Sequence, residues 1–146
     1  MSEEAYSHYL DTLSSPAHPS HHLERHVLHT DTAIACSDAA HYSQLALDGL
    51  HEAKRLGVNP GWRVDYKIAT NKIRVDKYVP LTGVHTTHAK EHSTVMATRD
   101  VRNAKDTANK CKDDAKRTGV AVWAAIQRDH RHVEIPDELR IDPNSE

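Results

Sequence analysis

The most constraining feature of this sequence is an alternation of apolar and polar residues between positions 61 and 79. Apolar side chains alternate with polar ones on both sides of a polar break, at Trp62, Val64, Tyr66 and Ile68 and then at Ile73, Val75 and Val79, with Lys77 as the one interruption. A period of two places these side chains on one face of a strand and the charged ones on the other. Asn71 tolerates the backbone that a tight turn needs. The pattern predicts a β-hairpin over residues 62–79.

Two registers of this hairpin fit the sequence. A turn at residues 70–71 sets Asp65 opposite Asp76, which places like charges together. A turn at residues 69–70 pairs Asp65 with Arg74 instead, and charge pairing prefers this arrangement. Both registers keep the apolar faces together, so the register stays open.

Two helices are predicted to cover the hairpin, because an isolated hairpin is only marginally stable. The first spans residues 38–56 and ends at Gly57, and the second spans residues 93–117 and ends at Gly119. The second has the more regular apolar steps of three and four residues, at Ala97, Val101, Ala104, Ala108, Cys111 and Ala115. Pro80 is expected to stop the second strand. We therefore expect an α+β fold, with a small antiparallel sheet built on the hairpin and packed by two main helices.

Composition points to a thin core. Of the 146 residues, 38% are hydrophobic, none is Phe, and the mean hydropathy is -0.71. A thin core in a chain of this size favours a stable oligomer. We expect one domain at residues 21–128, between an N-terminal arm at residues 1–20 and a C-terminal tail at residues 129–146.

The two ends are expected to contact other subunits. Both ends are acidic, whereas residues 52–117 carry 15 Lys and Arg against 8 Asp and Glu. Breakers between Ser14 and Ser20 detach the first arm, and Pro136 and Pro143 keep the tail extended. Expected interface residues are Tyr6, Tyr9 and Leu10 in the arm, Ala97, Ala104 and Ala108 on the second helix, and Ile135, Leu139 and Ile141 in the tail.

Several classes of protein are not indicated by the sequence. Cys36 and Cys111 lie far apart in sequence, which suggests neither a metal pair nor a disulfide framework. There is no apolar run long enough for a membrane span, no signal peptide, no glycine-rich phosphate loop and no Gly-x-Ser-x-Gly motif. We expect a protein without catalytic residues or a cofactor, made in the cytoplasm.

The 13 histidines raise the question of a metal site. His88, Glu91 and His92 form a His-x-x-Glu-His pattern, which matches the motif of inverted zincins. On a helix both histidines would share a face and hold one Zn²⁺ while Glu91 served as the base. A third ligand has no convincing position, although His85 is near in sequence. A small zinc-dependent hydrolase is thus one alternative function.

A second alternative is a nucleic-acid-binding accessory protein. Basic residues follow the second predicted helix at Arg99, Arg102, Lys105 and Lys112, where they could contact phosphates. The helix lacks the interleaved aromatic residues of a single-strand binder and any DNA-reading motif.

The order of elements over roughly residues 38–105 resembles a known family. The matching pieces are Ala53 to Leu56, Gly61 to Val64, Asn71 to Val75, Thr82, and the run from His88 to Asp100. They resemble small neck or tail-completion proteins of siphophages, especially those that infect actinobacteria. The resemblance implies α+β subunits of a ring between the connector and the tail tube, with no catalytic residues.

From this resemblance we expect a structural virion protein at the head-to-tail junction of a tailed phage. Its partners would be copies of itself in a closed ring, the adjacent neck, portal-side and tail-tube proteins, and packaged DNA in non-specific proximity, with no membrane. The long N-terminal arm, the histidine content and the extended tail depart from the family pattern. They leave open whether the ring is an adaptor, a stopper, a completion protein or a tail terminator.

Overall fold

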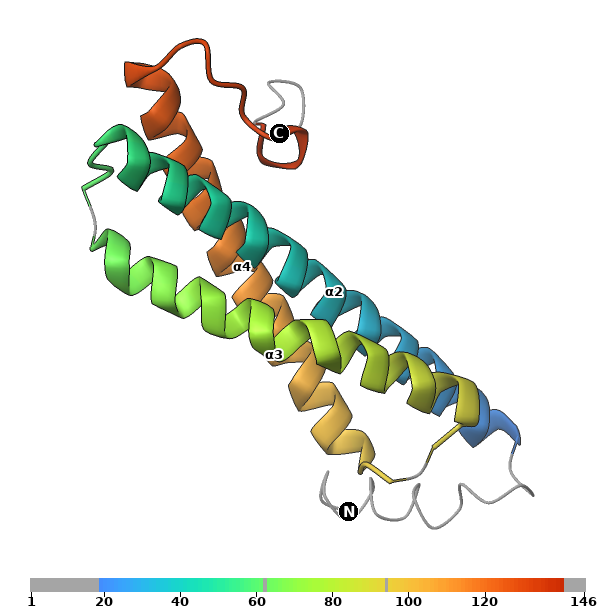
Figure 1. Ribbon diagram of the computed structural model, residues 1–146. Coiled ribbons are helices and arrows are strands. Elements are labelled where there is room, and N and C mark those ends of the chain that lie inside the picture. Colours follow the sequence, from blue (N-terminus) through green and yellow to red (C-terminus); the bar gives the residue numbers. More distant parts are fainter. Residues whose placement is uncertain (1–18, 62, 94, 141–146) are drawn as a thin grey trace. The chain divides into compact units, whose positions relative to one another are not determined.

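The computed structural model describes residues 19–61, 63–93 and 95–140, which form helices and their connections. Three long helices follow one another along the chain (Figure 1), namely α2 (Pro19–Leu56), α3 (Val64–Glu91) and α4 (Thr98–Asp129), before the short 3-10 helix η1 (Asp137–Leu139). The described part of the chain contains no strand. The predicted α+β fold is therefore wrong, because all the regular secondary structure of the described residues is helical.

Helix α3 replaces the predicted hairpin. Its least exposed positions recur every seven residues, at Val64, Asn71, Tyr78 and His85 and, four residues after each, at Ile68, Val75, Thr82 and Ala89. A seven-residue repeat is the pattern of a helix that buries one seam. It continues for the whole helix, whereas the alternation covers only two short runs, and Pro80 lies inside the helix without ending it. The longer repeat decides the structure because it buries more side chains.

The turn residue of the predicted hairpin shows the same correction locally. Asn71 is fully buried, and its Nδ2 donates a hydrogen bond to the carbonyl of Lys67, one turn earlier in α3, at 2.9 Å. In the helix, the Asn71 side chain therefore forms its hydrogen bond with a backbone carbonyl of α3, and the backbone at Asn71 is helical and not a turn.

The other helix boundaries are partly as predicted. α2 ends at Leu56, and Gly57 takes the left-handed backbone expected of a residue after a helix, with φ of 71°. It begins at Pro19, about twenty residues before the predicted start, so it includes the histidine-rich stretch. α4 runs to Asp129 and passes through Gly119, the predicted end.

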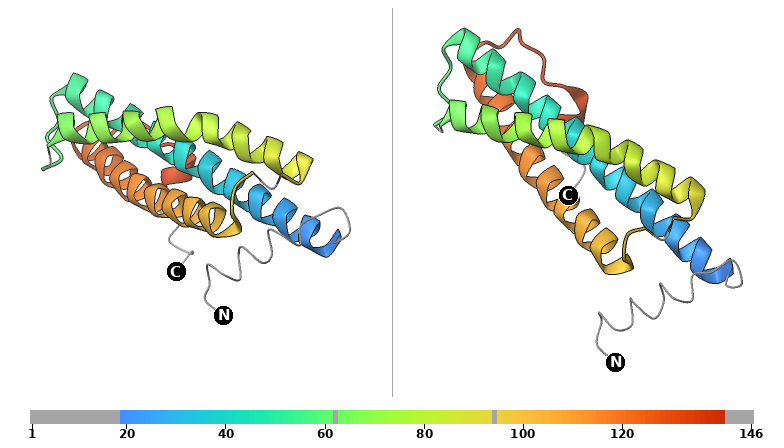
Figure 2. Two further views of the ribbon diagram at one scale, coloured as in Figure 1. Left: turned by 90° about the horizontal axis from the view of Figure 1, so that it is seen from below. Right: turned by 60° about the horizontal axis from the view of Figure 1, so that its bottom comes forward.

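The chain divides into two compact units. Unit 1 comprises residues 1–38 and 78–110, and unit 2 comprises residues 39–77 and 111–146. Each unit therefore contains one segment of each long helix, and Figure 2 shows the helices from two further sides. Within the described ranges, none of the helices combines the length and apolarity needed to cross a bilayer.

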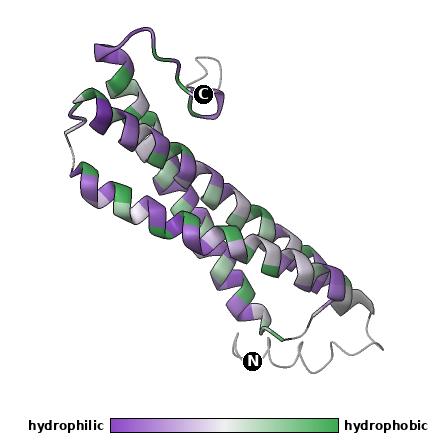
Figure 3. Cartoon of the chain, in the orientation of Figure 1, coloured by the Kyte–Doolittle hydropathy of each residue, from purple (hydrophilic) through white to green (hydrophobic). Residues whose placement is uncertain are grey.

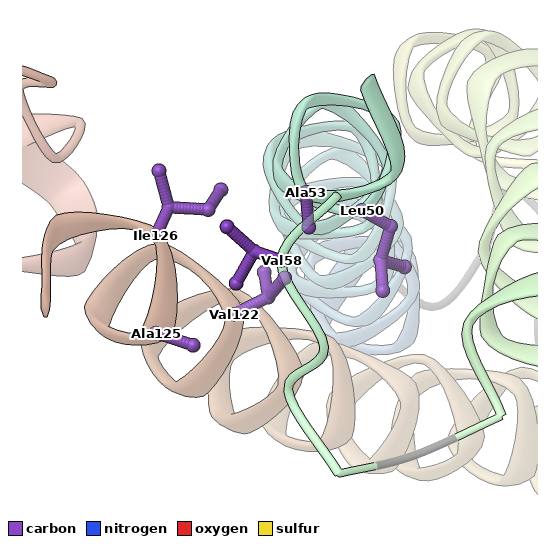
Figure 4. Close-up of a cluster of buried hydrophobic side chains, with 6 residues drawn as sticks. All are labelled: Leu50, Ala53, Val58, Val122, Ala125 and Ile126. Atoms are coloured by element: carbon purple, nitrogen blue, oxygen red, sulfur yellow. The ribbon is translucent and has the colours of Figure 1, made fainter. Parts of the chain in front are cut away.

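Unit 2 has the more apolar core (Figure 4). Leu50 and Ala53 of α2 and Val58 of the following loop meet three side chains of α4, namely Val122, Ala125 and Ile126. At the surface of the same unit, Arg74 donates to the Oδ2 of Asp114 at 2.6 Å, and this hydrogen bond lowers the pKa of the Asp114 carboxyl. Burial of the apolar side chains around Leu50, Val122 and Ile126 stabilises unit 2.

Gly49 lets α2 and α4 approach closely in unit 2, which makes it a test of this packing. A Cβ at position 49 would lie 2.7 Å from both the Trp123 Nε1 and the Val122 Cγ1. Trp123 is itself fixed, because its Nε1 donates to the carbonyl of Leu45 at 3.1 Å. We expect Gly49→Ala to lower the free energy of unfolding by about 1–3 kcal/mol, despite the better helix propensity of alanine.

Gly83→Ala is the matched control for this prediction. Gly83 also lies inside a helix, but a Cβ there has no atom within 4 Å. This change should raise the free energy of unfolding by about 0.5–1 kcal/mol, as expected for alanine in an exposed helix position. Urea titrations followed by circular dichroism measure both changes, and equal signs for the two variants would contradict the close approach at Gly49.

Candidate functional site

Unit 1 buries two histidines and an arginine in addition to its apolar side chains. Five histidines gather there, which we call the histidine cluster: His26 and His29 on α2, His85 and His88 on α3, and His92 directly after α3. His26 and His29 are three residues apart, as are His85 and His88, so each pair lies on one face of its helix. The two faces meet within the unit.

His29 and His85 form the centre of the cluster. Each is 1% exposed, their rings stack with centroids 5.3 Å apart, and their Nδ1 atoms are separated by 3.1 Å. A hydrogen bond at this distance requires one Nδ1 to donate and the other to accept, so at least the accepting ring is neutral.

His88 lies beside this pair. Its ring centroid is 5.3 Å from that of His29 and 6.4 Å from that of His85. Its Nδ1 is buried and makes no hydrogen bond in the structure. A buried polar atom without a partner costs about 1–3 kcal/mol, so this atom is a feature that needs an explanation.

The remaining polar groups close one end of the cluster. Arg25 is buried, and its Nη1 donates to the carbonyls of Ser93 and Met96, both at 3.3 Å. His26 Nδ1 donates to the carbonyl of Ala89 at 3.0 Å, and its ring lies 5.6 Å from that of His92. These bonds hold α2 against the end of α3 and the connection that follows it.

The charge state of the cluster follows from its burial. Burial lowers the pKa of His29 to about 4, with smaller contributions from His85, His88 and the guanidinium of Arg25. Burial also lowers the pKa of His85, with a further contribution from His88. Both central rings are therefore neutral at pH 7, with lone pairs available for a hydrogen bond or a metal ion.

The structure separates the residues of the predicted zinc hydrolase motif. His88 faces His29 and His85, whereas His92 lies outside α3, has a positive φ of 49° and packs against His26. Glu91 is exposed at the end of α3. The pair therefore does not share a helix face with Glu91 as base, because the helix ends between its two histidines.

The predicted interface residues fall in different environments. Ala108 is fully buried, and Leu139 is buried with its side chain against Gly119 of the same chain. Half-buried positions are Ala97, Ala104 and Ile135, while Tyr6, Tyr9, Leu10 and Ile141 lie outside the described residues. Of the four basic residues considered for phosphate contacts, Arg102 is exposed, and Arg99, Lys105 and Lys112 are half-buried.

His29 is the central residue that sequence reasoning missed. The metal motif considered from the sequence contains His88 and His92, which are four residues apart. The pairs that meet in the structure are three residues apart, namely His26-x-x-His29 and His85-x-x-His88. Two such pairs on two helices that pack together were the available signal.

Comparison with protein families, characterised proteins and solved structures finds no match for this chain.

Proposed function

We propose that this protein is a structural assembly subunit that works through contacts between copies of itself. The observation that supports this proposal most directly is an exposed apolar row on α2 in unit 1. Leu23, Val27 and Ile34 are 61%, 48% and 55% exposed, and steps of four and seven residues place them on one face of the helix. Apolar side chains in a row favour a partner surface more than water.

The surface beside this row has the shape of a docking site. Ile34 borders a largely apolar groove of about 370 Å³ between α2 and α3, whose other walls include Ala33, Thr82 and Ala89. Small side chains on both walls would let a helix of another copy approach closely. Unit 2 offers a similar feature by itself, since Tyr66 and Ile73, seven residues apart on α3, are 62% and 66% exposed.

Figure 3 shows hydrophobic and hydrophilic positions interspersed along the helices. Several of the large apolar side chains of this chain, on both α2 and α3, are exposed to solvent. A subunit that completes its apolar contacts on assembly would have this distribution.

The setting that we propose for this assembly is the neck of a tailed phage particle, as a ring between the head and the tail. Its support is the sequence resemblance, and the hairpin on which that resemblance drew is a helix in the structure. The proposal of an assembly subunit therefore rests on the exposed apolar rows. The proposal of a subunit in a phage neck is narrower and rests on the sequence resemblance alone. Flanking portal, capsid and tail genes would support the neck, and their absence would count against it.

Self-association is the first test of the proposal. We expect the full chain to have an oligomeric mass by light scattering and native mass spectrometry, with closed rings in electron micrographs. Replacing the row by Leu23→Ser, Val27→Ser and Ile34→Ser should lower that mass to a monomer or a smaller species, because an apolar contact is removed. A wild-type chain that stays monomeric at all concentrations would refute the assembly function.

A matched control uses exposed polar residues of the same helix. Asp48→Ser and His51→Ser are exposed on the segment of α2 that belongs to unit 2, at least 14 residues after Ile34 along the helix, and are not part of the apolar row. This pair should leave the oligomeric mass unchanged, and circular dichroism should show equal helix content in all variants. Salt-dependent binding of DNA by a monomer would favour the nucleic-acid alternative instead.

A further inference from the structure

Two of the clustered histidines have a spacing close to that of ligands on one metal ion. The Nδ1 atoms of His29 and His85 are 3.1 Å apart, and both side chains are buried between α2 and α3 in unit 1. A tetrahedral zinc ion holds nitrogen ligands at about 2.0–2.1 Å, which places two such nitrogens about 3.3 Å apart. An ion between them thus requires only a small change in their separation.

His88 supplies an independent observation. Its buried Nδ1 has no hydrogen-bond partner, although its ring is only 5.3 Å from that of His29. Buried polar atoms in native proteins are rarely left without a partner, and an absent ion is one of the usual reasons. The same atom would gain a partner if it bound a metal ion held by His29 and His85.

We propose that His29, His85 and His88 form a binding site for a divalent transition-metal ion, with Zn²⁺ as the representative ligand. Nδ1 atoms of His29 and His85 provide two ligands once the Nδ1 proton of the donating ring is replaced by a proton on the Nε2 of that ring, and His88 provides the third by turning its ring. As they stand, the residues that the structure describes include no group of three His, Cys, Asp or Glu side chains arranged to hold a metal ion. The turn of His88 is therefore part of the proposal.

The surroundings of the site both favour and oppose a cation. Neutral imidazoles are the form that binds metal, and the hydrogen bond between the Nδ1 atoms of His29 and His85 requires that at least the accepting ring is neutral. Arg25 acts against the ion, because its charge already disfavours protonated His29. Its guanidinium donates to the carbonyls of Ser93 and Met96, which engage part of that charge. This site is distinct from the apolar surface on which the assembly function rests.

The experiment titrates the chelator-treated full chain with Zn²⁺ by calorimetry and with Co²⁺ by its visible absorption. We expect one saturable site per chain and the absorption of a tetrahedral cobalt ion. His29→Asn and His85→Asn should each weaken binding by about 100-fold or more, since each removes a ligand and not merely its support. His51→Asn, at an exposed position of α2, should bind as the wild type does.

A second variant keeps the test decisive if the buried changes prevent folding. It retains the five cluster histidines and replaces all others by Asn, at positions His8, His18, His21, His22, His41, His51, His130 and His132. Unchanged one-site binding in this variant would place the ion in the cluster. Loss of binding here, or wild-type binding by folded His29→Asn and His85→Asn, would overturn the proposal.

The third ligand has its own readout. His88→Asn should weaken binding by at least about 10-fold and change the cobalt spectrum, because one imidazole leaves the coordination shell. X-ray absorption of the zinc-loaded wild-type chain should show three imidazole ligands. Only two imidazoles, with an unchanged affinity in His88→Asn, would refute the role of His88.

Discussion

Leu50→Ala is expected to lower the free energy of unfolding by about 3 kcal/mol, which is a large part of the stability of an ordinary domain. Leu50 is fully buried in unit 2, where its neighbours include Ala53, Val58 and Val122. Most of these neighbours are small and fixed on helices, so they cannot move in to fill the space that a leucine side chain leaves. The cost therefore includes both lost apolar burial and a cavity.

The matched control is a large-to-small substitution at an exposed helix position outside the proposed assembly surfaces. Val79 on α3 is 59% exposed, so Val79→Ala should change the free energy of unfolding by less than about 0.5 kcal/mol. Urea titrations at one fixed protein concentration measure both variants, because any self-association makes stability depend on concentration. A loss below about 1 kcal/mol for Leu50→Ala would contradict its place in the core.

Acid is expected to destabilise the metal-free protein through His29. The pKa of His29 is lowered from 6.5 to about 4 in the folded chain, mainly by burial and further by His85, His88 and Arg25. The unfolded chain therefore binds a proton at a higher pH than the folded chain does. The contribution of His29 to stability is complete above about pH 6.5 and decreases as the pH falls toward about 4, by about 3 kcal/mol in total.

The measurement is the free energy of unfolding between pH 7.5 and pH 4.5 in the presence of a chelator. Carboxylates also titrate toward the lower end, so the informative quantity is the difference between the wild type and His29→Leu. We expect a smaller loss of stability in His29→Leu than in the wild type or in His51→Leu, whose histidine is exposed. Equal losses in all three chains would show that His29 does not titrate as described.

The sequence allowed two of the three helices to be predicted in part. Regular steps of three and four residues indicated the helices that contain Ala46 and Ala108, and Gly57 marked the end of α2. Helix starts were less accessible, because the first part of α2 carries polar residues such as Arg25 and His29 in its buried seam. Hydrophobic periodicity does not detect buried positions that are polar.

Helix α3 could not be predicted from hydrophobic periodicity. Its β-branched residues, including Val64 and Ile73, fit a strand by local preference, and Asn71 fits a turn. Packing against the other helices overrides these preferences, since α3 buries Asn71, Tyr78 and His85 along one seam. All three of these side chains can form hydrogen bonds, so the seam is visible only when polar and apolar positions are counted together.

The histidine cluster was out of reach for a related reason. A site made from α2 and α3 requires knowing that residues about 56 positions apart meet, as His29 and His85 do. Because residues 62–79 were predicted to form a hairpin, α3 was not predicted as a helix. His85 and His88 were therefore not expected to share a helix face. The error in fold class therefore became an error about the site.

The many buried alanines have a consequence for the temperature dependence of stability. Unfolding exposes less apolar surface when the interior is built from residues such as Ala35, Ala39 and Ala115 than when it is built from leucine or phenylalanine. Newly hydrated apolar surface is the main source of the heat-capacity increase on unfolding. This increase should be small for the chain, so its stability curve is broad and shallow. Such a protein loses little stability in the cold and gains little at its optimum.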